Sequence, residues 1–243
     1  MRGPRLGSLA VRDADARELM DDPGCDPAML ARTYARFGLV NAFVSGQRTS
    51  YRHWIRPRRR LGSRGLRVLD VGTGGGDLPE RLARWAAADG FDVEVVGIDP
   101  DERAISFARR RPPVPGVRFE QATTRELAER GERFDVVVSN HVLHHLDGRE
   151  LGALLADSER LARPGGVVVH GDIERSRWGY AGFAAGTWPF RRNLLRGCYI
   201  RPDGLTSIRR SHTARELAPV LPAGWAVRRG FPSRLEVVWR APA

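Results

Sequence analysis

The stretch "VLDVGTGGGDLPERL" (residues 68–82) decides the fold of this chain. It joins an apolar run, the acidic Asp70, three alternating glycines and a helical segment without interruption. Glycines permit a tight turn and close backbone approach, so a ligand can lie against bare peptide at the start of the helix. The loop reads D-x-G-x-G-x-G rather than the dinucleotide pattern G-x-G-x-x-G, and Asp77 follows it. Carboxylates on both sides suit a cationic ligand better than a diphosphate.

Strands and helices alternate outward from this stretch. Further valine-rich runs occupy residues 93–99, 117–122, 134–140 and 166–173, and helical patterns occupy residues 77–89, 101–111, 123–131 and 149–162. Continuous apolar runs separated by helices indicate buried parallel strands in a doubly wound α/β sheet. Near the end, "WAVRRGF" and "RLEVVWRA" are only three residues apart, which is too short for a crossover helix. We therefore expect a mostly parallel, seven-stranded sheet with an antiparallel C-terminal hairpin at its edge.

The rest of the chain is divided around this sheet. Residues 1–20 are polar and weakly periodic, and we interpret them as a flexible tail. Residues 21–60 are helical, with Asp26 as N-cap and Pro27 at the first helical position, in one or two helices ending before Pro57. Residues 61–243 form the main domain. Its segment 174–207 is too apolar for a simple loop and too broken for a core helix, so we expect an insertion over the carboxyl ends of the strands.

Composition limits the function. The 243-residue chain carries a formal charge of +11, and because it has no lysine, all 40 positive side chains are arginine. This bias suggests genome composition rather than selection for phosphate binding. The basic runs 55–67 and 107–113 are interpreted as solvated surface, with a phosphate or peripheral membrane contact as the alternative. There is no apolar leader and no transmembrane stretch, so a cytoplasmic protein is expected. Cys25 and Cys198 stand in no metal-binding spacing and are expected to be free thiols.

The second apolar run ends in "VVGIDP", which places Asp99 where an acidic side chain binds ribose hydroxyls. With the glycine loop, this resembles the class I S-adenosylmethionine-dependent methyltransferases over about residues 66–173 and the terminal hairpin. The resemblance implies a Rossmann-like fold with S-adenosylmethionine as cofactor. The implied cofactor-binding residues are Asp70, Gly72, Thr73, Gly74 and Gly76 for the amino-acid end, Asp99 for the ribose, Pro100 near the adenine, Thr123 (or Gln121 or Thr124) for the adenine amine, and Asn140 beside Ser139 for the methionine part.

The missing lysine excludes two other nucleotide-binding classes. A short-chain dehydrogenase needs a Tyr-x-x-x-Lys pair, and a phosphate-binding P-loop needs Gly-Lys-Ser/Thr. This chain can supply neither.

The stretch "SNHVLHHLDG" (residues 139–148) holds His141, His144 and His145 just after the fourth strand. A zinc-binding His-x-x-x-His pair usually carries Glu beside its first histidine, and Val142 stands there instead, so no metal is predicted. His144, or else His145, is a candidate general base because an imidazole titrates near neutral pH. Asp172, at the end of the fifth strand, is the competing catalytic candidate. The alternatives are that both histidines only pack, and that Asp172 caps a helix or pairs with Arg175.

The segments "TYARFGLVNAFVSGQRTSYRHWIRP" and "DGLTSIRRSHTAREL" are similar to methyltransferases of bacterial aromatic polyketide and phenolic-lipid pathways. This likeness implies that an N-terminal helical lid and the 174–207 insertion enclose an aromatic acceptor. The candidate substrate walls are Tyr34, Phe37, Asn41, Trp178, Tyr180, Phe183 and Trp188.

We therefore predict methyl transfer to a hydroxyl, with carbon as the less favoured atom, of a small aromatic or polyketide-like substrate, with no obligatory nucleic acid. A nucleic-acid methyltransferase would explain the charge, but amine methylation of bases usually shows Asn/Asp-Pro-Pro-Tyr where this chain reads Ser139-Asn140-His141-Val142. A cofactor-binding protein with a non-methylating role would keep the same loop. A metal-dependent catechol methyltransferase would want carboxylates where Asn140 stands.

Overall fold

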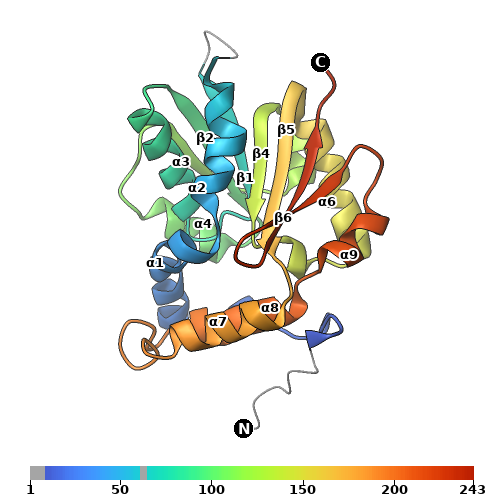
Figure 1. Cartoon of the computed structure of the whole chain (residues 1–243). Coiled ribbons are helices and arrows are strands. Elements are labelled where there is room, and N and C mark those ends of the chain that lie inside the picture. Colours follow the sequence, from blue (N-terminus) through green and yellow to red (C-terminus); the bar gives the residue numbers. More distant parts are fainter. Residues whose placement is uncertain (1–8, 61–64) are drawn as a thin grey trace.

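A seven-stranded sheet forms the centre of the molecule, in the order β3-β2-β1-β4-β5-β7-β6 (Figure 1). The computed structural model describes residues 9–60 and 65–243. The strands β1 to β5 are parallel, and β7 runs antiparallel to both β5 and β6. Their bounds are β1 Leu66–Val71, β2 Val93–Asp99, β3 Val117–Gln121, β4 Phe134–Asn140, β5 Ala162–Ile173, β6 Ala226–Gly230 and β7 Arg234–Arg240. The predicted sheet and its C-terminal hairpin are confirmed.

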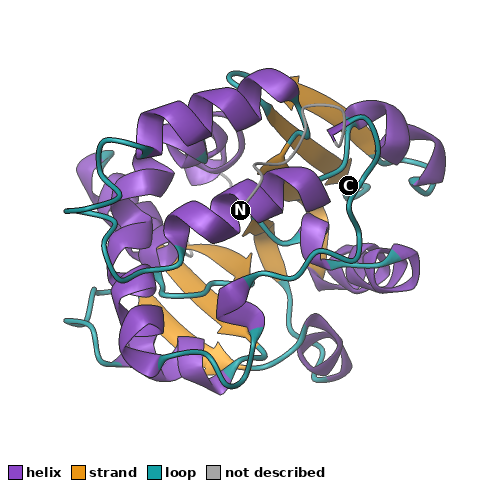
Figure 2. Cartoon of the chain, turned by 90° about the horizontal axis from the view of Figure 1, so that it is seen from below, coloured by secondary structure: helices purple, strands orange, loops and turns teal. Residues whose placement is uncertain are grey.

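Helices lie on either side of this sheet, as the view toward the carboxyl ends of the parallel strands shows (Figure 2). The crossover helices match the predicted segments. The helices are α1 Pro27–Val44, α2 Gln47–Ser50, α3 Asp77–Ala88, α4 Glu102–Arg109, α5 Thr124–Glu129, α6 Gly148–Leu161, α7 Arg177–Thr187, α8 Ile200–Arg210 and α9 Ala214–Leu217. Short turns occupy η2 Leu19–Asp21, η3 Tyr51–Ile55, η4 Arg56–Arg60, η5 Leu143–His145 and η6 Ala218–Val220.

Both faces of the sheet are covered, which explains the continuous apolar runs. In β1, Val68 packs into the core beneath α3, whereas the next residue, Leu69, packs into the core that α5 and α6 cover. Successive side chains of a strand point to opposite faces, so a strand buried on both faces must be apolar throughout. The order of the sheet reverses between β1 and β4, and open α/β sheets bind ligands at that point.

The N-terminal helices follow the prediction at their start and depart from it at their end. The carboxylate of Asp26 accepts hydrogen bonds from the backbone of Ala28 and Met29, and Pro27 stands at the first helical position. The helical path does not stop before Pro57, because it continues through η3 and η4. Pro57 stands near the start of the short η4 turn, where a missing backbone N–H interrupts no long ladder.

The 174–207 insertion is more regular than its sequence indicated. It contains α7 and the start of α8, which lie together below the ends of the strands (Figure 1). Glycine lets these two helices approach each other, because a Cβ on Gly204 would overlap the ring of Phe183. Gly204 is therefore a packing position within a helix, whereas residues 188–197 between the two helices form turns.

Residues 9–20 differ from the flexible tail that the sequence suggested, while residues 1–8 lie outside the described part. Leu9 and Glu18 are buried, and the backbone N–H groups of Leu19 and Met20 donate to the carboxylate of Asp203 on α8. We call residues 9–22 the N-terminal strap. Its contacts are with residues far along the chain, so local sequence periodicity does not reveal them.

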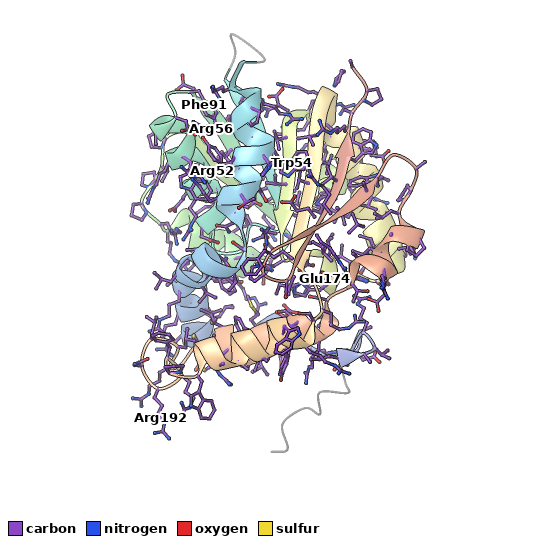
Figure 3. The ribbon with its side chains drawn as sticks, viewed as in Figure 1. Arg52, Trp54, Arg56, Phe91, Glu174 and Arg192 are labelled. Carbon is purple, nitrogen blue, oxygen red and sulfur yellow. The ribbon has the colours of Figure 1, made fainter. Side chains whose placement is uncertain are left out.

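The basic runs lie partly on the surface and partly in ion pairs. Arg56 of the first run lies on η4 and is exposed, while residues 61–64 of that run lie outside the described part. Arg52 on η3 and Arg192 in the turn after α7 belong to neither run and add further positive charge (Figure 3). Arg111 of the second run is instead held by Glu80 at 2.5 and 2.8 Å. Among the described residues, no helix is long and apolar enough to cross a membrane. Both cysteines are free, as predicted.

Candidate active site

A pocket of about 430 Å³ opens at the carboxyl ends of β1, β2 and β4. The N-terminal strap, α1, α7 and α8 complete its wall. The predicted residues that line it are Asp70, Gly72, Thr73, Gly74, Asp99, Pro100, Asn140, His144, His145, Tyr34, Phe37, Asn41 and Phe183. The sheet and the insertion therefore bring residues from distant parts of the sequence into one chamber.

The glycine loop exposes bare backbone to this pocket. Gly72 and Gly74 have φ values of 69° and 53°, a region that L side chains rarely adopt. A Cβ on Gly72 would overlap Val142, whereas the space around Gly74 is open. The backbone N–H of Gly74 donates to Asp99 at 2.9 Å, which joins the loop to the end of β2.

The loop half of the pocket is acidic. Asp70 is 2% exposed, and burial, with Asp77 and Asp99 nearby, raises its pKa well above the usual value. Burial likewise raises the pKa of Asp99. No arginine lines the described part of the pocket. A cationic group placed here would compensate these carboxylates, and this is the chemistry of a sulfonium cofactor with an amino-acid end.

An unpaired donor also points to a ligand. The side-chain Nδ2 of Asn140 is buried and has no hydrogen-bond partner within residues 9–60 and 65–243. Buried polar groups are usually satisfied, so an orphan donor in a pocket wall marks a place where a ligand atom can bind. The residues present therefore fit S-adenosylmethionine.

Two predicted cofactor residues lie outside the pocket lining. Thr123 is exposed and caps α5, since its hydroxyl accepts from the backbone of Glu126 while the Glu126 carboxylate accepts from the backbone of Thr123. Gly76 serves the turn into α3, where a Cβ would overlap the ring of Phe119. Of the alternatives to Thr123, Gln121 donates to the carbonyl of Pro100 and Thr124 donates to Asp157.

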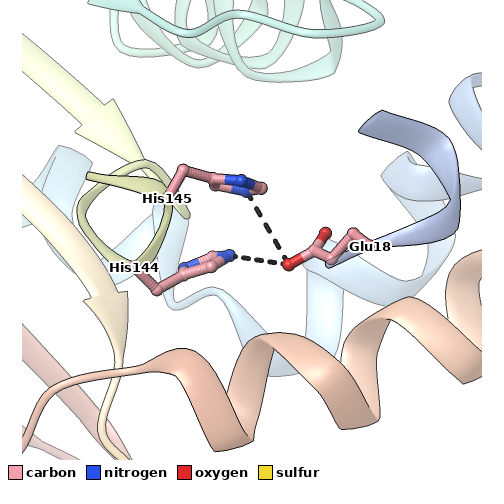
Figure 4. Close-up of side chains that lie close together, drawn as sticks. All are labelled: Glu18, His144 and His145. Atoms are coloured by element: carbon pink, nitrogen blue, oxygen red, sulfur yellow. Dashed lines mark ion pairs between the residues drawn. The ribbon is translucent and has the colours of Figure 1, made fainter. Parts of the chain in front are cut away.

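His144 lies between two carboxylates at the far side of the pocket and is 1% exposed. Its Nδ1 is 2.8 Å from Asp172, and its Nε2 is 3.2 Å from Oε1 of Glu18 (Figure 4). Burial lowers the pKa of His144, but the two carboxylates outweigh burial and raise it well above its usual value. His144 is therefore an imidazolium at neutral pH, which does not suit a general base.

His145 is more exposed to the pocket than His144. Its ring packs against that of His144 at a tilt of 36° and a centroid distance of 4.3 Å, and it is 31% exposed. Its Nδ1 lies 3.2 Å from Oδ2 of Asp21, and its Nε2 lies 3.8 Å from Oε1 of Glu18, beyond direct hydrogen bonding. Nδ1 of His145 thus faces a carboxylate, while Nε2 lies beyond hydrogen-bonding distance of Glu18.

The position of Asp172 does not support the catalytic role for which it was a candidate in the sequence analysis. It is 2% exposed and lies outside the pocket lining. Its carboxylate accepts from the backbone N–H of His144 and of Ile173, and from the His144 ring. Asp172 is an anchor for His144. Its suggested partner Arg175 pairs with Glu216 instead.

His141 combines backbone strain with a free side chain. Its φ is 62°, the only non-glycine residue with positive φ in the described ranges. Both ring nitrogens are buried without a hydrogen-bond partner there, and Nδ1 is 3.8 Å from Asp172. Strained residues with unsatisfied polar groups concentrate at functional sites, and His141 lines this pocket.

Apolar side chains close the remaining wall. Phe37, Val40 and Val44 come from α1, Phe183 from α7 and Ile200 from α8. These residues form a surface suited to a ring or an aliphatic chain.

Three aromatic residues that were predicted to line the substrate pocket lie outside it. Trp178 is 87% exposed and Trp188 is 55% exposed, so both face away from the core. Tyr180 is half-buried but does not line the pocket. The sequence placed these residues in the correct insertion, but it could not show which face of α7 points inward.

Glu18 and Asp21 are site residues that the sequence reasoning missed. Both come from the strap, in a segment without apolar periodicity. Glu18 also accepts a hydrogen bond from Ser207 at 2.8 Å. The only local signal was a pair of acids three residues apart in "ELMD", which is a common spacing.

The side chains of Glu18, His144 and His145 bring possible ligand atoms within 4.8 Å of one another. The sequence predicted no metal. The 3.2 Å approach of Glu18 to the ring of His144 describes an ion-pair cluster, in which each charge already faces an opposite one. We treat the three residues as such a cluster.

Comparisons with known proteins agree with this geometry. A family described as a methyltransferase domain matches residues 68–166. The ubiquinone biosynthesis O-methyltransferase of Azorhizobium caulinodans is 35% identical over 193 residues, which cover 79% of this chain and 71% of that protein. The protein of the same name from Rhizobium etli is 40% identical over 114 residues, covering 46% of this chain and 43% of its own length.

Solved structures share the fold. The plantazolicin methyltransferase in complex with SAH has a TM-score of 0.59 and 13% identity, covering 89% of this chain and 95% of that chain. Human N-acetylserotonin methyltransferase in complex with SAM has a TM-score of 0.62 and 12% identity, covering 98% of this chain and 66% of that chain. At such identities the likeness concerns the fold alone.

Proposed function

This chain belongs to the class I S-adenosylmethionine-dependent methyltransferases, and we propose that it methylates a hydroxyl oxygen of a small, uncharged aromatic or polyketide-like molecule. The cofactor supplies an electrophilic methyl group. The names of the relatives from Azorhizobium and Rhizobium, both O-methyltransferases, support oxygen as the acceptor atom.

The loop residues would hold the cofactor by charge and by backbone contact. The buried Asp70 and the half-buried Asp99 provide carboxylates, Gly72 and Gly74 leave room for close approach, and Asn140 offers an amide donor without a partner in the described residues. Since methyl transfer is an in-line displacement, most of the acceleration comes from holding the acceptor in near-attack geometry and excluding water. The strap and α8 cover the pocket and serve that purpose.

The observation that carries this proposal is a carboxylate-held imidazole beside an apolar wall. A phenol must lose its proton during transfer, and His145 can accept it because Asp21 stabilises the imidazolium that forms. The wall from Phe37 to Ile200 would bind the ring of the acceptor. The lining holds seven carboxylates and no arginine within the described residues, so an acidic acceptor would be repelled.

The test is incubation of the protein with S-adenosylmethionine and a panel of neutral phenols, phenolic acids and RNA, analysed by mass spectrometry. We expect O-methylation of neutral phenols. His145→Gln should lower kcat by about 10²–10⁴-fold, the usual contribution of a general base. The matched control is His53→Gln, since His53 is exposed on η3 away from the pocket. Methylation of RNA or of carbon, or full turnover by His145→Gln, would contradict the proposal.

A further inference from the structure

The two acids that face the histidines both come from the N-terminal strap. Glu18 lies 3.2 Å from Nε2 of His144, and Asp21 lies 3.2 Å from Nδ1 of His145. Figure 4 shows Glu18 facing both rings from a different segment than the turn that carries the histidines. The histidines themselves come from η5, more than a hundred residues later. The active-site cluster is therefore complete only when the strap is docked.

Several directed contacts fix the docked position. Arg12 donates to the carbonyls of His144 and Leu146, which ties the strap to the histidine turn itself. On the other side, Asp203 accepts from the backbone of Leu19 and Met20. These contacts are directional hydrogen bonds rather than apolar packing, so they fix the positions of the two strap carboxylates.

We propose that Glu18 and Asp21 are positioning residues for methyl transfer: Asp21 holds Nδ1 of His145 so that Nε2 is the free proton acceptor, and Glu18 fixes the charged ring of His144 beneath it. This inference rests on the proposed function for its catalytic meaning. It goes beyond that function because it assigns a catalytic positioning role to the N-terminal strap, which lies outside the cofactor-binding core.

His144 and His145 differ in burial, and their different roles in the proposal follow from this difference. His144 is almost completely buried. Its Nδ1 is hydrogen-bonded to Asp172 and its Nε2 faces Glu18 at ion-pair distance, so it serves as a fixed cation. His145 keeps one nitrogen free and is partly exposed, so it can exchange a proton with an acceptor. Other charged groups near the pair include Asp172 behind His144, Asp99 across the pocket and Arg12, which donates to the His144 carbonyl. Arg210 of α8 donates to the His145 carbonyl and also pairs with Asp21 at 3.4 Å.

Kinetics against pH tests Asp21. In Asp21→Asn the amide can still accept from Nδ1, but the charge that stabilises the imidazolium is lost. We expect kcat at neutral pH to fall about tenfold or more, and the acid limb of the kcat profile to move to lower pH. The KM for S-adenosylmethionine should change little. In a background of His145→Gln, the same substitution should have no further effect, because Asp21 acts through His145.

Imidazole resonances in nuclear magnetic resonance test Glu18 without any activity measurement. In Glu18→Gln the His144 ring should lose its proton at a lower pH than in the unsubstituted protein, while the fold is retained. The matched control is Asp15→Asn, which removes an exposed acid from the same strap. Its kinetics and spectra should match those of the unsubstituted protein.

The outcomes separate the two proposals. If Asp21→Asn and Glu18→Gln behave like Asp15→Asn in kcat profile and in ring titration, the positioning role is wrong. A loss in both variants that merely follows reduced folding, with no shift in either profile, also overturns it. If His145→Gln retains full turnover but the ring titrations shift as expected, the base assignment in the proposed function fails while the strap still sets the charge of the histidines.

Discussion

Replacing Asp172 by asparagine tests whether this residue anchors His144 or acts as a base. Its carboxylate accepts the backbone N–H groups of His144 and Ile173 and the His144 ring, at 2.8, 2.7 and 2.8 Å. An asparagine amide presents one NH₂ group, which must face one of these donors whichever way it is turned. Breaking one side of a buried ion pair costs about 3–5 kcal/mol. For a chain of this size, that loss corresponds to a fall in Tm of roughly 10 °C.

The pKa shifts of Asp172 and His144 determine how the stabilising effect of this pair changes with pH. Burial opposes ionisation of Asp172, but the charge of His144 outweighs it and holds the Asp172 pKa well below its usual value. This contribution is present above the usual pKa of about 4 and is lost as pH falls through the native value. The His144 pKa is raised to about 10, so its contribution is complete below the usual value of about 6.5 and is lost as pH rises toward 10.

Urea denaturation of Asp172→Asn and the unsubstituted protein, between pH 4 and 10, would measure the effect. The difference in unfolding free energy should be largest at about pH 4–6.5 and should shrink at higher pH. The matched control is Asp92→Asn, because Asp92 is exposed. A loss below about 1 kcal/mol, or one that does not vary with pH, would show that Asp172 and His144 are not a buried ion pair.

Three further predictions concern ligands. The affinity for S-adenosylmethionine, measured by calorimetry, should rise with pH as Asp70 and Asp99 ionise, since a cation prefers the charged carboxylates. The substitution Asp99→Asn should weaken this affinity about tenfold. An affinity that does not change with pH would refute this reasoning. A phenol bearing a carboxylate should show a kcat/KM roughly tenfold below its neutral analogue, and equal values would show that the acidic lining does not select the acceptor. Dialysis against a chelator should leave turnover unchanged, because Glu18 already faces the charged ring of His144 in an ion pair. Loss of activity that a divalent cation restores would contradict this.

The sheet and the loop could be predicted because their signals are local. Residues 66–71 are mostly apolar because both faces of β1 are buried, with Arg67 and Asp70 as the polar exceptions, and a strand of that kind is visible in any short window. The glycine loop is equally local, since Gly72 adopts a backbone conformation that other residues avoid. Asp99 follows from its place at the end of the next strand. Such features need no knowledge of distant contacts.

Thr123 shows how a local signal can be assigned to the wrong purpose. Its position at the end of β3 suggested a contact with the cofactor. The sequence "TTRE" also carries a Thr-x-x-Glu capping box, with Glu126 three residues later, and that pattern predicts a helix start. The hydroxyl is used by α5, so it is not available to the pocket.

The strap could not be predicted because its stability is entirely long-range. Glu18 contacts Ser207 and His144, and Arg12 contacts the turn at residues 144–146. The strap itself is polar and almost without regular structure, which is also the composition of a disordered tail. Only the three-dimensional arrangement of its acceptors distinguishes the two cases.

The pocket differs in charge from the protein as a whole. The chain carries 40 arginines and a formal charge of +11, yet the described pocket lining contains acids and histidines and no arginine. A positive surface attracts anions over long distances, whereas the buried Asp70 and the half-buried Asp99 select at short range for a cation. Because exposed charges are screened by salt and buried charges are screened much less, specificity should be set by the pocket. The net charge, which first suggested nucleic acid, therefore carries little information about the molecule that this site accepts.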